Sequence, residues 1–518
     1  MTDLSFTFDT MATSEPISES ADSTGLIESP APEAKDESYR FLHPSNPDSA
    51  YQRAHWEIAD TDRLNEAHWR FAQEMPVNDA LRDRLSIIRA RAVHESGNNP
   101  TLEGLKLQHT VAIHGESGPT VDLQSEDEAG DQWATEAEDL FESWAECADA
   151  AGSRSLADML KHFNFSCWDD GEFLFQRVNE DRRFRKPSIP DLRLKTIEAQ
   201  RLKDPMGAAS LDVVLGIRRN QHGRPLDYWI EEPLHRFNQR GNWIPADLLY
   251  HGFDDVQARS GQVRGIPWSQ WGLPVAADVR DYDFQVLDAA RQVADNPLFA
   301  YTEHADSEFA GNVPKELTYR RRKVNFLAPG WKPNTPPPTH PGAHYTDHRQ
   351  ELHGDVGKAK GVPSMVTRLD ARDHSYSSAR FDYSLLGESA NHCRNTMYTP
   401  LIRKLVREVI FEAVAMRLIA PPPSAVFFEL VWPQQPAIDQ QKAANAENTY
   451  LGNGTVAYSD AISRNHGKRT RDVIRIRARD NRQLVAAGLP TVEETVSRNA
   501  VAVVEEKEED GTKKTGED

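Results

Sequence analysis

The sequence predicts an α+β fold in which helices come first, strands occupy the middle and long helices follow. Three observations lead to this prediction: helical spacing of apolar residues before residue 170, strand-like segments between 172 and 231, and long helical stripes after 274. Hydrophobic residues make up 38% of the 518, and the 11 Trp predict real cores. At ~100–200 residues per domain, the length indicates roughly three domains.

The first helices are predicted from apolar stripes and capping residues. Asn78 can cap a helix over 79–94, and a second stripe predicts a helix over 131–150. A third helix is expected to begin at Ser155 and to end near residue 165. The chain is therefore predicted to be helical before its first strand.

The strands are predicted next. Residues 172–178 and 192–198 read as strands, and the second segment alternates clearly between apolar and polar side chains. Residues 211–218 and 224–231 flank the sequence N-Q-H-G at 220–223, which predicts a hairpin turn with a glycine at positive φ.

Two long helices are predicted after Pro274. The first covers 275–295 and carries a narrow apolar stripe, which suits packing in an assembly or on the surface of one domain. A proline-rich connector follows at 329–345. The second helix begins at Thr399 as its cap, with Pro400 in its first turn, and extends to about residue 420.

Both ends of the chain are predicted to be disordered. Residues 1–45 are rich in Ser, Pro, Asp and Glu, and 497–518 are similarly charged. Such segments cannot bury enough apolar surface to offset the entropy lost on ordering. The first ten residues also lack the basic and apolar regions of a secretory signal.

Composition excludes several classes of protein. Sixty Lys and Arg against 80 Asp and Glu give a net charge of −20, which disfavours a broad basic face that grips nucleic acid. Cys147, Cys167 and Cys393 are too few for a disulfide framework or a four-cysteine zinc site. No stretch approaches the ~18 apolar residues of a membrane span.

The sequence contains no recognisable catalytic motif. Residues 467–470 read G-K-R-T, but the upstream glycine and small residues of a phosphate-binding loop are missing. No G-x-G-x-x-G follows a strand, and neither H-E-x-x-H nor G-x-S-x-G occurs. We therefore expect neither an enzyme nor a cofactor.

Two groups of residues have the chemistry of metal ligands. The first is His340, His344, His348 and His353 with Asp347, and the second is Asp169, Asp170 and Glu172. The first group begins in a proline-rich connector, and the second is equally explained as a turn before a strand. We therefore expect no metal site.

Two basic clusters stand out from the acidic whole. The first is Arg320, Arg321, Arg322 and Lys323. In the second, Arg475, Arg477 and Arg479 alternate with Ile474, Ile476 and Ala478. This alternation predicts a half-buried strand with the arginines on one face. Such arginines are candidates for contact with DNA or a partner, although ion pairs within the chain are the simpler alternative.

Five blocks of sequence carry a family resemblance. They lie at 167–172, 216–230, 249–268, 361–380 and 438–468, and residues 261–268 read G-Q-V-R-G-I-P-W. Together the blocks resemble the lambda-type family of bacteriophage portal proteins. The resemblance implies a portal-type fold with an α/β wing, long stem helices, a clip and a mainly helical crown.

The resemblance also implies a function. Portal proteins of this type form a ring of about twelve copies at one capsid vertex, and the ring is the head–tail connector. The channel admits double-stranded DNA during packaging and releases it on ejection. The implied partners are the terminase, the major capsid protein and a head–tail adaptor. The protein would be assembled in the host cytoplasm and would remain in the virion, without a membrane.

The same resemblance implies a division of the chain. The wing would cover 46–270, the first stem helix 271–296 and the clip with its proline-rich connector 297–345. The second stem and inner channel helices would cover 346–420, and the crown 421–496.

Ten residues of the resembling blocks are expected to have structural roles. They are Gly261, Gln262, Arg264, Gly265, Pro267, Trp268, Tyr376, Ser377, Ser378 and Arg380. Gly261 and Gly265 would permit turns that bring Trp268 onto the base of the stem. Tyr376 and Ala379 would pack against neighbouring residues, and Arg380 would make an ion pair or cap a helix.

Two other functions compete with this interpretation. One is a metal-dependent nucleic-acid hydrolase of a phage or mobile element, which would use the histidine group or the acidic group described above. The other is a scaffold without a role in DNA handling. The acidic charge itself suits a channel, because an acidic wall cannot hold phosphates firmly.

Overall fold

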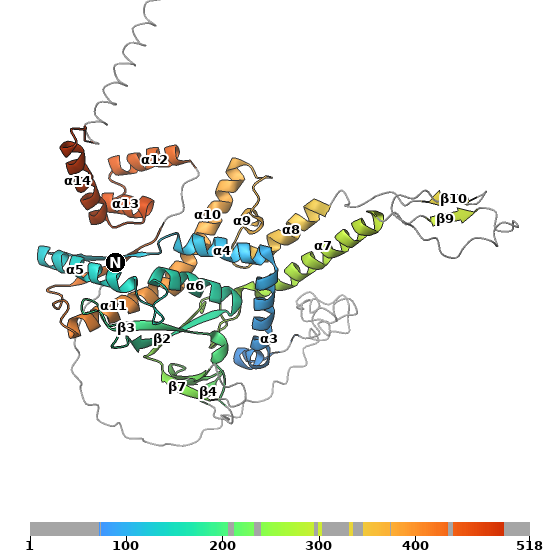
Figure 1. Ribbon diagram of the computed structural model, residues 1–518, viewed down its shortest axis with the longest axis horizontal. Coiled ribbons are helices and arrows are strands. Elements are labelled where there is room, and N and C mark those ends of the chain that lie inside the picture. The colour runs from blue at the N-terminus through green and yellow to red at the C-terminus, as the bar shows by residue number, and fades with distance from the viewer. Residues whose placement is uncertain are drawn as a thin grey trace, which may run out of the picture. The chain divides into compact units, whose positions relative to one another are not determined.

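The computed structural model describes residues 72, 74–205, 212–232, 240–294, 299–302, 331–334, 345–372, 374–433 and 439–491 (Figure 1). All described helices and strands belong to one unit. The predicted disordered ends, most of the proline-rich connector and the Arg320–Lys323 cluster lie outside the described residues. The mixture of helices and antiparallel sheets confirms the predicted α+β class.

Four helices precede the main sheet. They are α3 (Val77–Asn98), α4 (Pro100–His114), α5 (Glu128–Ala145) and α6 (Leu156–Asp169). Asn99, Asp127 and Ser155 cap the last three, because each side chain accepts a hydrogen bond from a backbone N–H of the first turn. The helix α4 was not predicted. Asn78 does not cap α3 but lies inside it, with its side chain bound elsewhere.

A three-stranded antiparallel sheet follows α6. Its central strand β2 (Glu172–Asn179) pairs with β3 (Leu192–Ile197) and β8 (Leu249–Phe253). The ring of Phe163 on α6 stacks on Phe173 and Phe175 of β2, with 4.8 Å between ring centroids in both cases. The sheet is therefore held against α6 by aromatic side chains.

A second antiparallel sheet contains four short strands. They are β4 (Val213–Val214), β5 (Ile217–Arg219), β6 (Pro225–Glu231) and β7 (Gly241–Pro245), in that order. The predicted hairpin turn is confirmed, with φ of +84° at Gly223. The single strand predicted over 211–218 is wrong, because Leu215 and Gly216 both have positive φ and turn the chain between β4 and β5.

Two long helices are placed side by side after this sheet (Figure 1). The short helix η4 (Trp268–Trp271) leads into α7 (Leu273–Ala294), which confirms the helix predicted over 275–295. The partner of α7 is α8 (Tyr345–Lys358). Asp283 of α7 accepts hydrogen bonds from the Tyr345 hydroxyl at 2.7 Å and from Arg349 at 2.9 Å. In the sequence between α7 and α8, strand β9 (Phe299–Thr302) pairs antiparallel with β10 (Trp331–Asn334).

A nearly continuous helix follows the short α9 (Ser364–Arg368). It consists of α10 (Tyr376–Cys393), a π-helical turn η6 (Arg394–Tyr398) and α11 (Thr399–Ala415). Thr399 is therefore not a cap, because the preceding Tyr398 is already helical. The π turn accommodates the missing N–H of Pro400 without ending the helix.

The last elements are β11 (Val426–Val431), α12 (Gln440–Gly452), α13 (Tyr458–His466) and α14 (Thr470–Ala486). The strand β11 pairs antiparallel with β1 (Thr120–Ser125) and so connects distant parts of the chain. The strand predicted through Arg475, Arg477 and Arg479 is wrong, because these residues lie on α14. Arginine and alanine favour helices, and no neighbouring strand pairs with this run in the described chain.

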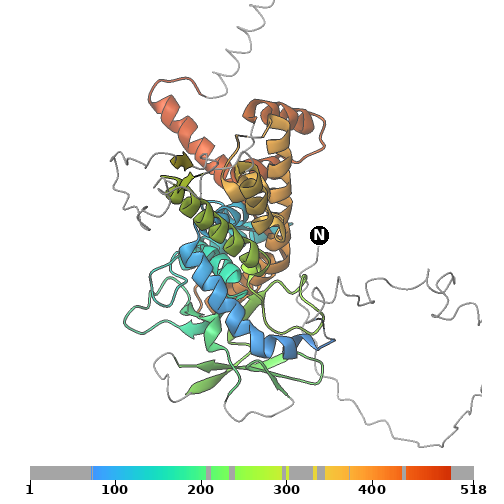
Figure 2. The ribbon, with the colours of Figure 1, turned by 90° about the vertical axis from the view of Figure 1, so that its right-hand side faces the viewer.

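The described residues form two hydrophobic cores. The larger contains Trp144, Trp168 and Tyr398 and is built by α4, α5, α6, α11 and β2. In the smaller core, Leu81 and Leu85 of α3 pack near Ile217 and Ile230, so that α3 lies beside the four-stranded sheet (Figure 2). None of the described helices is long and apolar enough to cross a membrane.

Candidate functional site

A buried carboxylate lies where the two cores meet. Glu172 is the first residue of β2 and is 0% exposed. It follows Gly171, whose φ is +85° and whose missing Cβ leaves room for the backbone of Ile266 and Pro267. The turn after α6 therefore brings two distant segments into contact and directs Glu172 into the interior.

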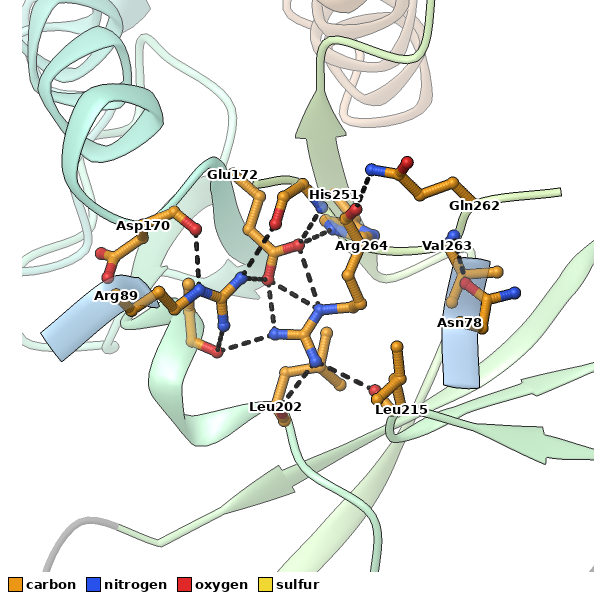
Figure 3. A network of polar contacts seen from close by, with 12 residues as sticks. Asn78, Arg89, Asp170, Glu172, Leu202, Leu215, His251, Gln262, Val263 and Arg264 are labelled. Atoms are coloured by element: carbon orange, nitrogen blue, oxygen red, sulfur yellow. Dashed lines mark hydrogen bonds and ion pairs between the residues drawn. The ribbon is translucent and has the colours of Figure 1, made fainter. Parts of the chain in front are cut away.

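Arg264 is the main partner of this carboxylate (Figure 3). Its Nε lies 2.8 Å and 3.0 Å from the two Glu172 oxygens, and its Nη2 lies 2.5 Å from Oε1. Its remaining N–H groups donate to the carbonyl oxygens of Leu202, Leu215 and Ala199 at 2.8–3.0 Å. One buried guanidinium thus connects β2 with the loop before β4 and the turn after it.

Arg89 and His251 complete the cluster. Arg89 of α3 approaches Glu172 to 2.9 Å and donates from Nε to the Asp170 carbonyl oxygen at 2.7 Å. His251 of β8 lies 3.0 Å from Glu172 through its Nε2. Burial alone raises the pKa of Glu172, but Arg264, Arg89 and His251 outweigh it and hold this pKa well below its usual value. Glu172 is therefore ionised at neutral pH.

Backbone contacts position the segment that carries Arg264. The N–H of Gly265 donates to Glu172 at 2.9 Å, and the Gln262 side chain donates to the Arg264 carbonyl oxygen at 2.7 Å. Asn78 binds the same segment at the Gly261 carbonyl oxygen and the Val263 N–H. Gly261 has a φ of +81°, whereas a Cβ on Gly265 would collide with the Gly171 carbonyl oxygen.

Trp268 ends this segment and begins η4, just before the long helix α7. Its ring is 3% exposed and lies edge-on to Trp168 and His109, at centroid distances of 6.0 Å and 5.6 Å. The Nζ of Lys360 lies 4.6 Å from the ring centroid and 2.8 Å from Asp254. The preceding Pro267 lies against Gly171. The base of α7 is therefore anchored in the larger core.

The Tyr376–Arg380 block is not part of this cluster. It begins α10, where the Ser375 hydroxyl accepts a hydrogen bond from the Ser378 N–H. The side chain of Tyr376 is 49% exposed, and its ring centroid lies 5.8 Å from the Nζ of Lys442. Ser377 and Arg380 are also exposed, and no ion pair of Arg380 occurs within the described residues.

The structure brings no metal site together among the residues it describes. His348 and His353 lie on α8, while His340 and His344 fall outside the description. Two members of the acidic group are paired with cations: Asp169 binds Lys106 at 2.8 Å, and Glu172 binds Arg264. Asp170 differs, because its Oδ1 is buried without a hydrogen-bond partner among the described residues, and burial raises its pKa to about 6. One such carboxylate does not supply the several oxygen ligands that a divalent cation needs.

The second basic cluster is exposed on α14. Arg475, Arg477 and Arg479 all lie at the surface. Arg477 donates to the Tyr458 hydroxyl at 2.8 Å, and Arg479 lies 3.0 Å from Asp480. Contacts within the described residues therefore engage Arg477 and Arg479 of this cluster.

Sequence reasoning missed Arg89, His251 and Lys360. Arg89 lies at the fourth position after Leu85 and the third before Ala92, so it occupies the apolar stripe of α3. A charged residue in such a stripe signals a buried partner. His251 lies inside the block 249–268 that resembles the family, and this position could have marked it as a structural residue.

The chain matches the family model for phage portal proteins of the lambda family over residues 62–386. Among solved structures, a chain in the neck of an empty GTA particle has 14% identity and a TM-score of 0.40, covering 79% of this chain and 94% of its own. A chain in the virion of a native gene transfer agent has 13% identity and a TM-score of 0.39, with 79% and 94% coverage. An HK97-family phage portal protein from Corynebacterium diphtheriae has 10% identity and a TM-score of 0.31, with 68% and 96% coverage. No curated protein matches.

Proposed function

Because the chain belongs to the lambda family of phage portal proteins, we propose that it forms a ring at one capsid vertex and encloses the channel for genome DNA. The match over residues 62–386, most of the chain, is the observation that carries this proposal. The family is structural, so the chain is not an enzyme, and the hydrolase alternative is set aside. DNA would pass inward during packaging and outward during ejection.

The surface of α7 supports assembly into a ring. One face of α7 carries Leu273, Ala277, Phe284 and Leu287, at intervals of four, seven and three residues. Phe284 is 64% exposed and Leu287 is 50% exposed. Ala276 and Val279 lie on the adjoining side of the helix and are buried, and Leu273 packs partly against the larger core. The exposed Phe284 and Leu287 mark a surface that a partner covers, and the proposed partner is the neighbouring copy.

A groove continues this face toward α3. Its volume is about 850 Å³, and Leu273, Ala277 and the 49%-exposed Ile87 contribute to its lining. The groove extends the apolar surface from α7 onto a second helix. The neighbouring copy would therefore bury side chains of both α3 and α7.

As part of this proposal, we assign the wing, stem, clip and crown to the described elements. The wing, 46–270, would contain the three-stranded and four-stranded sheets, and α7 would be the stem helix within 271–296. The clip, 297–345, would include the β9–β10 pair. Residues 346–420 would supply the second stem and inner helices, and 421–496 would supply the crown with α12, α13 and α14.

The proposed partners follow from the same role. DNA would pass a wall whose net charge of −20 per copy limits tight phosphate binding. The exposed arginines of α14, with Arg320–Lys323, are the candidate contacts for DNA or a partner protein. The terminase, the major capsid protein and a head–tail adaptor would dock on the outer surfaces. The protein would be assembled in the host cytoplasm.

A double substitution on α7 tests the assembly surface. Phe284→Glu with Leu287→Glu places two charges where the neighbouring copy would bury apolar side chains, so we expect rings to disappear from native mass measurements and electron micrographs. The control is Phe184→Glu, which changes an exposed phenylalanine (66%) in the loop between β2 and β3. Rings that form equally well in the α7 variant would contradict this interface.

A further inference from the structure

The surface of α14 carries two parallel rows that no described element covers. Arg475, Arg479 and Arg482 form an arginine row, at intervals of four and three residues. Ile474, Ala478 and Val485 form an apolar row beside it, with Ile474 53% exposed and Val485 64% exposed. No residue of α14 is buried. The helix therefore presents charge and apolar surface together.

The arginines at the start of α14 are paired with carboxylates. Arg469, just before the helix, binds Glu138 and Glu142 of α5 at 2.5 Å each. Arg471 also binds Glu138, and it donates to the Thr135 hydroxyl at 2.6 Å. Glutamates therefore already hold the first turn of α14 against α5. The arginine row lies further along the helix and receives no such partner from α5.

We propose that the arginine and apolar rows of α14 bind the acidic C-terminal segment of the same chain, residues 492–518. This segment contains nine acidic residues and four basic ones, with five of the acids between Glu505 and Asp510. It also contains the apolar residues Val492, Val496, Val501, Val503 and Val504. The segment thus offers carboxylates for the arginine row and valines for the apolar row.

The length of the chain allows this contact. A helix of 17 residues such as α14 is about 26 Å long. The 14 residues that follow Thr491, up to and including Glu505, can span up to ~46 Å when extended, so the carboxylates can reach every arginine of the row. Gly488, with a φ of +70°, ends the helix and turns the chain before Pro490. The covalent connection raises the effective concentration of the segment at α14 to the millimolar range.

DNA is the natural competitor for the arginine row, since its phosphates offer the same charge as the carboxylates. The apolar row favours the C-terminal segment, because a phosphate backbone leaves Ile474 and Val485 in water. In the free protein the segment would cover the row, and a polyanion at high local concentration would displace it. This inference concerns a single chain and does not depend on ring formation.

A peptide-binding experiment tests the proposal. The probe is a fluorescent peptide of residues 492–518, and the receptor is a chain that ends at Thr491 and keeps every described element. We expect the peptide to bind this shortened chain and to bind the full chain at least ten-fold more weakly, because the full chain's own segment occupies the site. Binding should weaken with added salt.

Two matched variants locate the contact. Replacing Arg475, Arg479 and Arg482 by glutamine should weaken peptide binding to the shortened chain at least ten-fold. The same replacement of the exposed Arg182, Arg183 and Arg185, in the loop before β3, should leave binding unchanged. Peptide binding that survives the α14 replacement, or no peptide binding, would overturn the proposal.

The same receptor distinguishes other occupants of the two rows. A short DNA duplex that binds through the arginine row while the peptide does not would assign the row to DNA. Self-association of the shortened chain that the α14 replacement abolishes, again without peptide binding, would assign the rows to a second copy. Both results would reject the C-terminal segment as the occupant.

Discussion

Glu172 shows how one buried residue can join segments that are far apart in sequence. Its carboxylate contacts the guanidiniums of Arg89 on α3 and Arg264 in the loop before η4, and the imidazole of His251 on β8. Burying charged groups costs desolvation free energy, and the attraction between the partners offsets this cost only while all of them are present. The cluster therefore holds the sheet, α3 and the base of α7 together and does not act as a reactive centre.

Removing the charge of Glu172 should destabilise the fold strongly. In Glu172→Gln the two guanidiniums stay buried without a counter-charge, so the unfolding free energy should fall by ~3–5 kcal/mol in urea titrations. Glu146→Gln, at an exposed position after α5, serves as the control. A loss below about 1 kcal/mol for Glu172→Gln would show that the cluster contributes little to stability. Because the pKa of Glu172 is depressed, its contribution is present above about pH 4.5 and is lost as the pH falls.

His114 should make stability depend on pH in the same acidic direction. Burial, aided by Arg394, lowers its pKa to about 3, and both ring nitrogens lack a partner among the described residues. Below about pH 6.5 the unfolded chain binds a proton here that the folded chain rejects, so stability falls by up to ~1.4 kcal/mol per pH unit.

The variant His114→Leu tests this effect. The loss of unfolding free energy between about pH 7.5 and about pH 5 should be ~2 kcal/mol smaller than in the unmodified chain. Comparing the two pH values within each variant cancels the change in packing. His222→Leu, at an exposed turn, is the control. An identical pH dependence in His114→Leu and the unmodified chain would contradict the assignment of a neutral, buried His114.

Only some of the residues in the Glu172 cluster could be predicted from the sequence. Gly261, Gln262, Arg264 and Gly265 were singled out as a structural segment. The structure brings the last three to Glu172 or its partners, while Gly261 binds Asn78. Glu172 itself was read as an acid in a turn, because its charge partners lie about 80 residues before it and 90 after it. Periodicity and spacing describe neighbours along the chain and do not identify such distant pairs.

At the scale of elements, the apolar stripe of α7 predicted its helix, α4 was missed, and one alternating run, Ile474–Arg479, was wrongly predicted to be a strand. The stripe of α7 predicted its ends within two residues, since many turns contribute to the pattern. The run Ile474–Arg479 fits strand alternation over only six residues, whereas its arginines and alanine favour a helix and no described strand pairs with it. A short alternating run is therefore weaker evidence than the propensity of the whole segment.

The Arg469 contact should control how firmly α14 is held. Arg469 is 4% exposed and binds Glu138, Glu142 and Asp472. In Arg469→Gln the buried Glu138 loses a counter-charge, so amide hydrogen exchange in α14 should become at least roughly ten-fold faster. The adjacent, exposed Lys468→Gln is the control. Unchanged exchange in α14 would show that other contacts position this helix.

At the scale of the whole molecule, the described chain consists of a mixed α+β body closed by a long-range strand pair. β1 and β11 are separated by some 300 residues and join the N-terminal helices to the segment after α11. No local pattern predicts that pairing, although each strand alone has strand-like composition. The family resemblance, in contrast, could be detected from the sequence, because several short blocks along the chain each resemble a segment of the family.

The central claim is that this acidic, non-enzymatic chain assembles into a portal ring. The most direct measurement is negative-stain imaging of the purified protein, combined with its mass in solution at increasing concentration. The account predicts closed rings with a central hole and a mass of about twelve copies. A chain that remains a compact monomer at high concentration, with or without scaffolding and capsid proteins, would contradict it.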